Sequence, residues 1–313
     1  MTAIIILNWN GADYTIACLD SLSLAKGSFF IVIADNGSRD DSLARLKKYA
    51  TLSHLDIRIL ELGRNHGFAG GNNLAIQYAS RSNPDNYLLL NNDTEVMPDL
   101  IERICTFQSE NERFRIITPR INYWSDRNVV WNCGGDMFLG FRKYRYANCN
   151  ENRVVRKDYF RVTFVTGCAL FFMPDVLNPD GTVFTERFFF GEEDFDLCWR
   201  MNALGVQMAC VTNAVVYHKI SSSESQMDKS GKVYLHLLNR YIDMRIKMKG
   251  WQFFLWRCLY FPATFRALMR SLGTVRLAFP GYRKLMADVR ANDSVTEADF
   301  KRLVMPDKNR DHV

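Results

Sequence analysis

The sequence lacks the features that would place it across a membrane or outside the cell. No stretch of 18 apolar residues occurs in the 313-residue chain, whereas a membrane-spanning helix needs about 20. Met1-Thr2 leads directly into an apolar segment at 3–7, so no signal peptide is predicted. The eight cysteines are single and widely spaced, with no Cys-x-x-Cys pair, which argues against zinc binding and thiol redox chemistry. Reduced, buried cysteines of this kind predict a cytoplasmic protein.

Two common nucleotide-binding fingerprints are also missing. No G-x-x-x-x-G-K-[ST] segment occurs, and Gly67, Gly70 and Gly71 do not fit G-x-G-x-x-G. A P-loop kinase and a Rossmann dehydrogenase are therefore disfavoured. The glycines either let a ligand approach the backbone where a helix begins or form a left-handed turn, and the sequence leaves both open.

Acidic residues are scarce near the C-terminus. Residues 232–313 contain 16 Lys and Arg against 7 Asp and Glu (+9), whereas the rest of the chain has 24 against 27 (−3). Segment 244–287 has no acid, nine bases and nine aromatic residues, a composition typical of an amphipathic segment on an anionic membrane surface. Pro262 is expected to break or kink it. A helical appendage packed on the rest of the chain and a homodimer interface remain alternatives, and no nucleic-acid-binding module is recognised.

The N-terminal part of the chain alternates short apolar segments with helical patterns. This rhythm predicts an α/β fold with a mainly parallel, doubly wound sheet, and Ser38 is a suitable N-cap for a helix through Tyr49. Since the carboxyl ends of parallel strands share one edge, polar clusters that follow the strands should converge on a nucleotide site. The predicted strands are 3–7, 29–34, 57–62 and 87–90, and the clusters are Asn8/Asn10, Asp35/Asn36 and Asn91/Asn92/Asp93.

Asp93 has two interpretations. The apolar run that begins at Tyr87 stops abruptly on Asn91-Asn92-Asp93. A carboxylate flanked by amide oxygens at a strand end suits a divalent cation that also holds a substrate phosphate. The same residues also fit an Asx turn ahead of the helix that Pro98 begins.

The second half of the chain is less regular. Residues 116–161 predict loops and short antiparallel strands, and 162–172 predict a strand interrupted at 165–169. Exposed aromatic residues on such loops would be able to stack on a sugar ring, although core packing is the commoner use. His218 follows the predicted strand 211–217. It is either a structural residue or a metal ligand together with Asp93.

Four acids lie within five residues after the aromatic run 188–190, and apolar residues at helical spacing follow them up to Gly205. Acids at a helix N-terminus complement its dipole without any chemistry. Like charges clustered beside an apolar wall also resist ionising together, which tunes one of them towards general-base work. The sequence alone does not choose between these interpretations for Glu192, Glu193, Asp194 and Asp196.

Seven segments in order resemble family 2 glycosyltransferases of the GT-A fold, and in particular their bacterial rhamnosyltransferase-like branch. The resemblance covers about residues 3–220. It implies a Rossmann-like, mainly parallel sheet with helices on both faces, divided into a nucleotide-sugar half (about 1–120) and an acceptor half (about 121–220), with a C-terminal helical extension at 221–313. The matching segments are 4–11, 35–38, 65–73, 90–95, 166–167, 193–200 and His218.

The resemblance also implies roles for single residues. Asp194 matches the catalytic base, with Glu193 beside it, and Asp93 matches the second acid of the D-x-D metal motif, whose first position is Asn91. Asp93 and His218 are therefore expected to hold Mg²⁺ or Mn²⁺. Trp131 and Gly167 are expected at the acceptor. The family often has Arg-Asn where this chain has Leu238-Asn239-Arg240, so no role follows for Arg240. The expected nucleotide-sugar contacts are Asn8, Asn10, Asp35, Asn65, Gly67, Asn72, Asn91 and Asn92.

The implied function is inverting transfer of a sugar from dTDP-rhamnose or a UDP-sugar to a hydroxyl of a glycan or lipid-linked acceptor in cell-surface polysaccharide synthesis. The enzyme would work at the inner face of the cell membrane as a peripheral protein. A nonenzymatic module that binds nucleotide sugars or polysaccharides is one alternative, which the acids at 93, 193 and 194 argue against. A nucleotidyltransferase is another, but Asn8-Trp9-Asn10-Gly11 lacks the phosphate loop of such enzymes.

Overall fold

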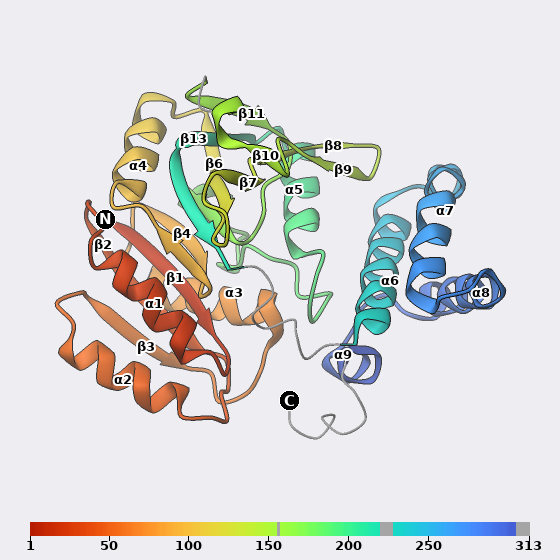
Figure 1. Cartoon of the computed structure of the whole chain (residues 1–313), viewed down its shortest axis with the longest axis horizontal. Helices are drawn as coiled ribbons and strands as arrows, with labels where there is room; N and C mark the ends of the chain where they lie inside the picture. The colour runs from red at the N-terminus through yellow and green to blue at the C-terminus, as the bar shows by residue number, and fades with distance from the viewer. Residues whose placement is uncertain (155–156, 220–227, 305–313) are drawn as a thin grey trace. The chain divides into compact units, whose positions relative to one another are not determined.

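The computed structural model describes residues 1–154, 157–219 and 228–304 (Figure 1). The chain divides into two compact units, which we call the catalytic unit (Met1–Thr185 and Asp194–Ser222) and the helical unit (Glu186–Glu193 and Ser223–Val313). The predicted domain boundary at 220–221 lies outside the described residues.

The sheet of the catalytic unit is built around parallel strands. The first four pair in the order β4-β1-β2-β3, with all three pairings parallel. Each of these strands is a nearly continuous apolar run, because parallel strands are covered on both faces and bury the side chains of both. Figure 1 shows these strands side by side. Their bounds are β1 (Thr2–Asn8), β2 (Phe29–Asp35), β3 (Ile57–Glu61) and β4 (Asn86–Asn91).

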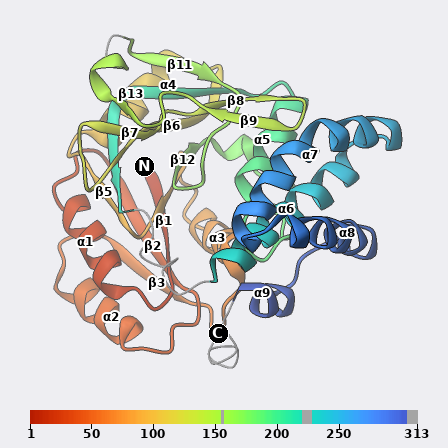
Figure 2. The same ribbon diagram turned by 45° about the vertical axis from the view of Figure 1, so that its right-hand side comes forward.

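Helices cover both faces of this sheet (Figure 2). Alternate residues of β1, Ile4 and Ile6, share a core cluster with α1 (Ala12–Leu22), α2 (Ser42–Leu52) and α4 (Leu100–Glu110). On the opposite face, α3 (Gly67–Ser80) approaches β1 so closely that a Cβ on Gly71 would lie 2.6 Å from a methyl group of Leu7. The predicted α/β class with helices on both faces is confirmed.

The second half of the catalytic unit adds antiparallel pairs to the sheet. β12 pairs antiparallel with β4, and β13 pairs parallel with β6 and antiparallel with β5 and β11. A separate hairpin joins β8 and β9. The bounds are β5 (Thr94–Val96), β6 (Phe114–Tyr123), β7 (Val129–Asn132), β8 (Gly135–Phe138), β9 (Phe141–Tyr144), β10 (Cys149–Asn150), β11 (Tyr159–Val162), β12 (Ala169–Phe172), α5 (Glu193–Ala203) and β13 (Gln207–His218).

One strand prediction in this half is wrong. Residues 162–172 do not form a single interrupted strand but the end of β11 and the whole of β12, which pair with different partners. Between them the chain turns at 166–168, where the amide of Asn91 donates to the Cys168 carbonyl (2.8 Å). The turn therefore ends beside the end of β4.

The helical unit contains α6 (Lys229–Lys247), α7 (Gly250–Leu272), α8 (Val275–Ala291) and α9 (Glu297–Val304). Its core centres on the fully buried Tyr241, whose ring lies 5.2 Å from that of Trp256 and 6.4 Å from that of Tyr282. α7 continues through Pro262, so the predicted break is wrong, and the alternative of a kink stays a prediction. A proline there removes one backbone hydrogen bond, and the buried Thr264 and Leu268 beyond it keep the helix packed. None of the helices in the described residues is both long and apolar enough to span a bilayer.

Candidate functional site

The polar strand ends of the catalytic unit lie beside one another. In the parallel register of β1 with its two neighbours, Asn8 is opposite Asp35 and Leu7 is opposite Asn91. We call this row of Asn8, Asp35 and Asn91 the strand edge. Asn8 and Asp35 are buried, with 0% and 3% of their surface exposed, so their polar atoms need partners within the protein.

Asn8, Asp35 and Ser38 bind each other. The Asn8 amide donates to Asp35 Oδ1 (2.9 Å) and to Ser38 Oγ (3.2 Å). The Ser38 hydroxyl and backbone amide donate to the Asp35 carboxylate at 2.6 and 3.0 Å. Ser38 is therefore not the N-cap predicted for the next helix, because its hydroxyl oxygen accepts from the Asn8 side chain and the Asn10 amide instead of from a helix amide. α2 begins later, with Asp41 as its N-cap.

The loop before α3 is organised by Asn36. Its side-chain amide donates to Asn65 Oδ1 (3.0 Å) and to the Gly67 carbonyl (3.1 Å), and its Oδ1 accepts from the His66 amide (2.8 Å). Gly67 has a φ of +73° and begins α3, so the left-handed turn is confirmed, and the approach of a ligand to this backbone stays a prediction. Asn72, also expected at the nucleotide, instead donates to the Phe68 carbonyl within α3 (2.9 Å).

Asn10 and Asn92 are tied to the strand edge through short contacts. Asn10 adopts a φ of +48°, and its backbone amide donates to Ser38 Oγ (2.9 Å), which also accepts from the Asn8 side chain. Asn92 donates to the Thr15 hydroxyl (3.1 Å), which in turn donates to Asn8 Oδ1 (2.8 Å). Both predicted residues therefore lie within one hydrogen-bonded chain around Asn8.

Asp93 and His218 are brought together although 125 positions separate them in the sequence. β5 and β13 pair antiparallel with Thr94 opposite His218, and Nε2 of His218 lies 3.1 Å from Oδ1 of Asp93. Each residue has 8% of its surface exposed. Among the described residues, no group of three or more His, Cys, Asp or Glu side chains is gathered as a metal site would require. The pair is therefore two potential ligands rather than a complete cage.

The protonation of His218 follows from its neighbours. Burial lowers the pKa of this imidazole, but contacts with Cys168 and Asp93 outweigh burial and raise its pKa above the usual value. Because burial also raises the pKa of the Cys168 thiol, we attribute the raised pKa of His218 to the charge of Asp93. The protonated imidazole therefore donates a hydrogen bond to Asp93 in this geometry.

The two residues expected at the acceptor pack against different side chains of the catalytic unit. The Trp131 ring lies 4.7 Å from that of His218. A Cβ on Gly167 would come within 3.2 Å of the Phe68 ring at the start of α3. Only a glycine fits there without displacing Phe68. Trp131 therefore shields the Asp93–His218 pair, and Gly167 allows close packing.

In the catalytic unit, the acids at the start of α5 have different partners. Asp194 lies 3.6 Å from the guanidinium of Arg142 on β9. Asp196 binds Arg200 (3.0 Å) one helical turn later and accepts from the Thr185 hydroxyl (2.6 Å). Arg142 was missed by the sequence analysis. Its only signal was its place in an aromatic and basic run, which did not indicate that it would reach Asp194.

In the helical unit, the preceding acids are held by α6 and by the backbone. Glu192 has a φ of +74° and binds Nε of Arg240 (2.6 Å), both side chains being buried. Glu193 accepts from the Gly191 amide (2.7 Å), and Asn239 donates to the Phe190 carbonyl (2.8 Å). Asn239 and Arg240 thus hold the segment that leads into Asp194, a role that the altered Leu-Asn-Arg motif did not reveal.

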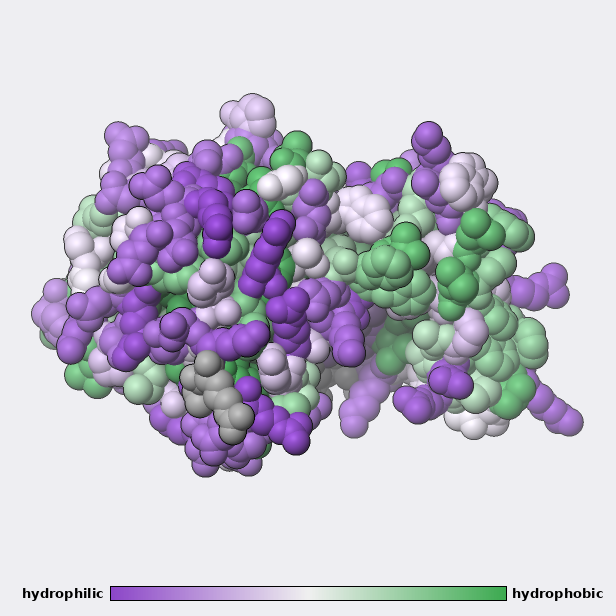
Figure 3. Space-filling model, turned by 90° about the horizontal axis from the view of Figure 1, so that it is seen from above, coloured by the Kyte–Doolittle hydropathy of each residue, from purple (hydrophilic) through white to green (hydrophobic). Residues whose placement is uncertain are grey.

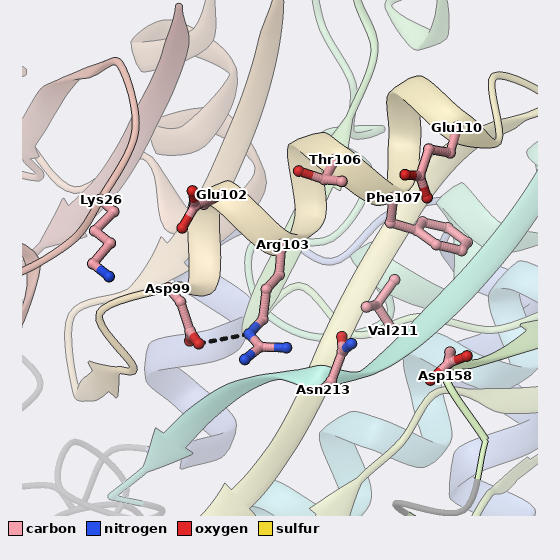
Figure 4. A pocket seen from close by; sticks show the side chains of 10 residues that line it. All are labelled: Lys26, Asp99, Glu102, Arg103, Thr106, Phe107, Glu110, Asp158, Val211 and Asn213. Carbon is pink, nitrogen blue, oxygen red and sulfur yellow. Dashed lines mark hydrogen bonds and ion pairs between the residues drawn. The ribbon is translucent and has the colours of Figure 1, made fainter.

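Figure 4 shows a pocket on another part of the catalytic unit, between α4 and β13. Its volume is about 460 Å³, and no residue predicted for the site lines it. Four carboxylates face two basic groups, so a nucleoside diphosphate would be repelled there. The charged lining residues are Asp99, Glu102, Glu110, Asp158, Lys26 and Arg103.

Two named glycosyltransferases are similar to this chain in sequence. The low-salt glycan biosynthesis hexosyltransferase Agl10 of Haloferax volcanii is 24% identical over 77% of this chain and 74% of its own length. The rhamnosyltransferase WbbL of Escherichia coli K12 is 24% identical over 77% of this chain and 92% of its own.

Solved structures share the fold at low sequence identity. The S. aureus TarS fragment 1–349 in complex with UDP-GlcNAc is 15% identical with a TM-score of 0.61, covering 99% of this chain and 85% of that one. The mannosyltransferase PcManGT of Pyrobaculum calidifontis, in complex with GDP-Man and Mn²⁺, is 13% identical with a TM-score of 0.56, covering 93% and 75%. The predicted GT-A fold is confirmed.

The family model described as glycosyl transferase family 2 matches residues 3–178. This span covers more than half of the 313 residues and contains the strand edge and Asp93. The chain therefore belongs to glycosyl transferase family 2 and is a glycosyltransferase.

Proposed function

We propose that the protein is an inverting glycosyltransferase that moves a sugar from a nucleoside diphosphate to a hydroxyl of a glycan or lipid-linked acceptor in cell-surface polysaccharide synthesis. The observation that carries this proposal is the placement of the strand edge, with Asp93 two residues after Asn91 and 3.1 Å from His218. Ligands of open α/β sheets bind at the carboxyl ends of the strands.

The donor would lie along the strand edge, with its base near Asp35 and its diphosphate near Asp93. The Asn8–Ser38 network fixes Asp35 before any ligand arrives, which lowers the ordering cost of binding. A relative named as a rhamnosyltransferase and a fold neighbour solved with UDP-GlcNAc support dTDP-rhamnose or a UDP-sugar as the donor. Rhamnose is the first sugar to test.

Asp93 and His218 fit a divalent cation that also binds a diphosphate. Two neighbouring ligands of an octahedral ion, each about 2.1 Å from it, lie about 3 Å apart, and the pair is separated by 3.1 Å. Mg²⁺ commonly takes its other ligands from substrate phosphates and water. When bound, Mg²⁺ or Mn²⁺ would neutralise charge on the leaving diphosphate. The imidazole would have to give up its proton to become a ligand.

Asp194 is the better candidate for the general base of the two acids in the predicted pair. Glu193 is buried and accepts from the Gly191 amide, whereas the Asp194 carboxylate lies 3.6 Å from the Arg142 guanidinium. The Asp194 carboxylate would take the proton from the acceptor hydroxyl as its oxygen bonds to the anomeric carbon. The bond from that carbon to the diphosphate breaks at the same time, so the configuration inverts in one displacement.

The test is Asp194→Asn, assayed by nucleoside diphosphate release from dTDP-rhamnose and UDP-sugars with Mn²⁺ and a glycolipid extract. Turnover should fall by about 10²–10⁴, and the donor-induced rise in melting temperature should be unchanged. EDTA should abolish turnover of the wild type. Asp99→Asn, which alters an acid on α4 paired with Arg103, should leave turnover unchanged. An active Asp194→Asn enzyme would overturn the assignment of the base.

A further inference from the structure

The outer side of α7 is apolar where a surface helix is normally polar. Trp251, Phe254, Leu255 and Leu259 have 65%, 55%, 52% and 65% of their surface exposed. Their spacing of three, four and eight residues places them on one side of the helix. A helix packed on a core usually has one apolar stripe facing that core and a polar outer side, and the exposed row departs from this pattern.

The opposite side of α7 is already packed within the helical unit. Trp256, Thr264 and Leu268 are buried, with at most 3% of their surface exposed. The Tyr241 hydroxyl lies 2.9 Å from that of Thr264. The exposed row is therefore a second apolar face, additional to the one that α7 needs for folding.

Basic residues continue the same side of the helix. Arg266 and Arg270 are exposed and follow the row at helical spacing, and Arg276 and Arg283 are exposed on α8. No ion pair involves these four arginines within the described residues. No acid occurs anywhere in 244–287. We call Trp251, Phe254, Leu255, Leu259, Arg266 and Arg270 the α7 stripe.

The hydrophobic surface extends to the first turns of α8. Val275, Leu277 and Phe279 are exposed by 55%, 52% and 57%, and the Phe279 ring lies 4.8 Å from that of Phe265 on α7. Figure 3 shows hydrophobic residues gathered over these helices, with hydrophilic side chains projecting among them. Exposed apolar groups concentrated in this way mark an interaction site rather than ordinary surface.

The positive charge of this surface favours an anionic partner over a second copy of the chain. In a symmetric contact between two copies of the chain, the same patch meets itself, which would bring the stripe's unpaired arginines towards the arginines of the other copy without an acid to neutralise them. An anionic partner with an apolar layer beneath its charge avoids this repulsion. We propose that the α7 stripe binds the surface of an anionic phospholipid bilayer.

In this arrangement, the aromatic and leucine side chains enter the boundary between headgroups and acyl chains, as in other interfacial amphipathic helices. Arg266 and Arg270, with Arg276 and Arg283 of α8, bind lipid phosphates. Each basic group near such a surface adds to the attraction, and salt screens it. The membrane contact does not depend on which sugar is transferred or which acid is the base.

Flotation of the full-length protein with vesicles tests this contact. Wild-type protein should float with vesicles of phosphatidylcholine and phosphatidylglycerol at 7:3, and less with phosphatidylcholine alone or in high salt. The pair Leu255→Glu/Leu259→Glu and the pair Arg266→Glu/Arg270→Glu should each lower partitioning at least about tenfold. The control pair Lys48→Glu/Leu52→Glu, on the exposed part of α2, should not. Circular dichroism confirms that each variant is folded.

Two outcomes would overturn the proposal. One is wild-type protein that does not float with anionic vesicles, including the case in which it sediments as a dimer that the stripe variants dissociate. The other is folded stripe variants that float as the wild type does. Asp194→Asn should float normally, so a failure of the proposed catalytic base and a failure of the membrane contact give different results.

Discussion

Two acidic regions of the molecule differ in what holds their side chains. At the strand edge, Asp35 is bound by Asn8 and by Ser38, three residues away. In the run at 192–196, each acid has its own partner: Glu192 binds Arg240, 48 residues away, and Asp194 lies beside Arg142 on another strand. Asn8, Asp35 and Ser38 thus form one hydrogen-bonded network, whereas the acids at 192–196 bind separate partners.

This difference shows how acids that are close in sequence can have different roles. Glu192 and Glu193 hold the segment at the start of α5. Asp196 stabilises α5 through Arg200, and Asp194 is the acid that we propose as the base. A sequence run of like charges does not indicate this division, because each use depends on which partner the fold supplies.

The largest loss of stability should come from removing Arg240, which is the partner of Glu192 in the acid run. Arg240→Met leaves the buried Glu192 carboxylate without its cation, which costs about 3–5 kcal/mol. Urea unfolding followed by the tryptophan fluorescence of the helical unit would measure this loss. Glu192→Gln added to Arg240→Met should restore part of it, because the buried charge is then removed as well. An unchanged midpoint for Arg240→Met would show that the pair is not structural.

The strand edge could be largely predicted from the sequence, because each apolar run and the polar residue that ends it are local features. Parallel pairing then brings Asn8, Asp35 and Asn91 together without further information. The error at Ser38 is also local. Its hydroxyl was expected to accept from a backbone amide of α2, and the sequence did not show that it would instead donate to the Asp35 carboxylate.

The partners of the acid run could not be predicted from the sequence, since they come from segments that are distant in the chain. Arg142 reaches Asp194 from a hairpin, and Asn239 and Arg240 reach 190–192 from α6. His218 was matched with Asp93 as one of two open interpretations, and the register of β5 on β13 supplies the physical reason for their proximity. The exposed side of α7 needed the structure as well, because composition gave its charge and aromatic content but not which side is packed.

Substitutions of Asn8 and Asp35 should each cause a smaller loss of stability, and the two losses should be strongly coupled. Asp35→Asn removes a carboxylate that accepts three hydrogen bonds, and Asn8→Asp places two carboxylates side by side, so each should cost about 1–3 kcal/mol. The double variant restores one amide and one carboxylate and should recover at least about 1 kcal/mol. Thermal unfolding of the ligand-free protein measures this coupling.

The same double-mutant cycle on Asp194→Asn and Asp196→Asn provides the contrast. Because their partners differ, the two losses should add to within about 0.5 kcal/mol. Strong coupling there, or its absence between positions 8 and 35, would break the distinction between a network and separate attachments.

The smallest loss of stability should come from replacing an acid whose partner is a nearby backbone amide. Asp228 caps α6 by accepting from the Gly231 amide (2.6 Å), and hydrogen bonds from Ser230 and Gly231 lower its pKa below 3.8. Its contribution is therefore present above about pH 4 and is lost as the pH falls through the lowered pKa. Asp228→Ala should cost about 1 kcal/mol at pH 7, with the difference from wild type shrinking below pH 3.8. Asp228→Asn keeps the cap without the titrating group, so its stability at pH 7 should match the wild type. If both variants lose equally, the negative charge of Asp228 beside the N-terminus of α6, rather than the capping hydrogen bond, stabilises the helix.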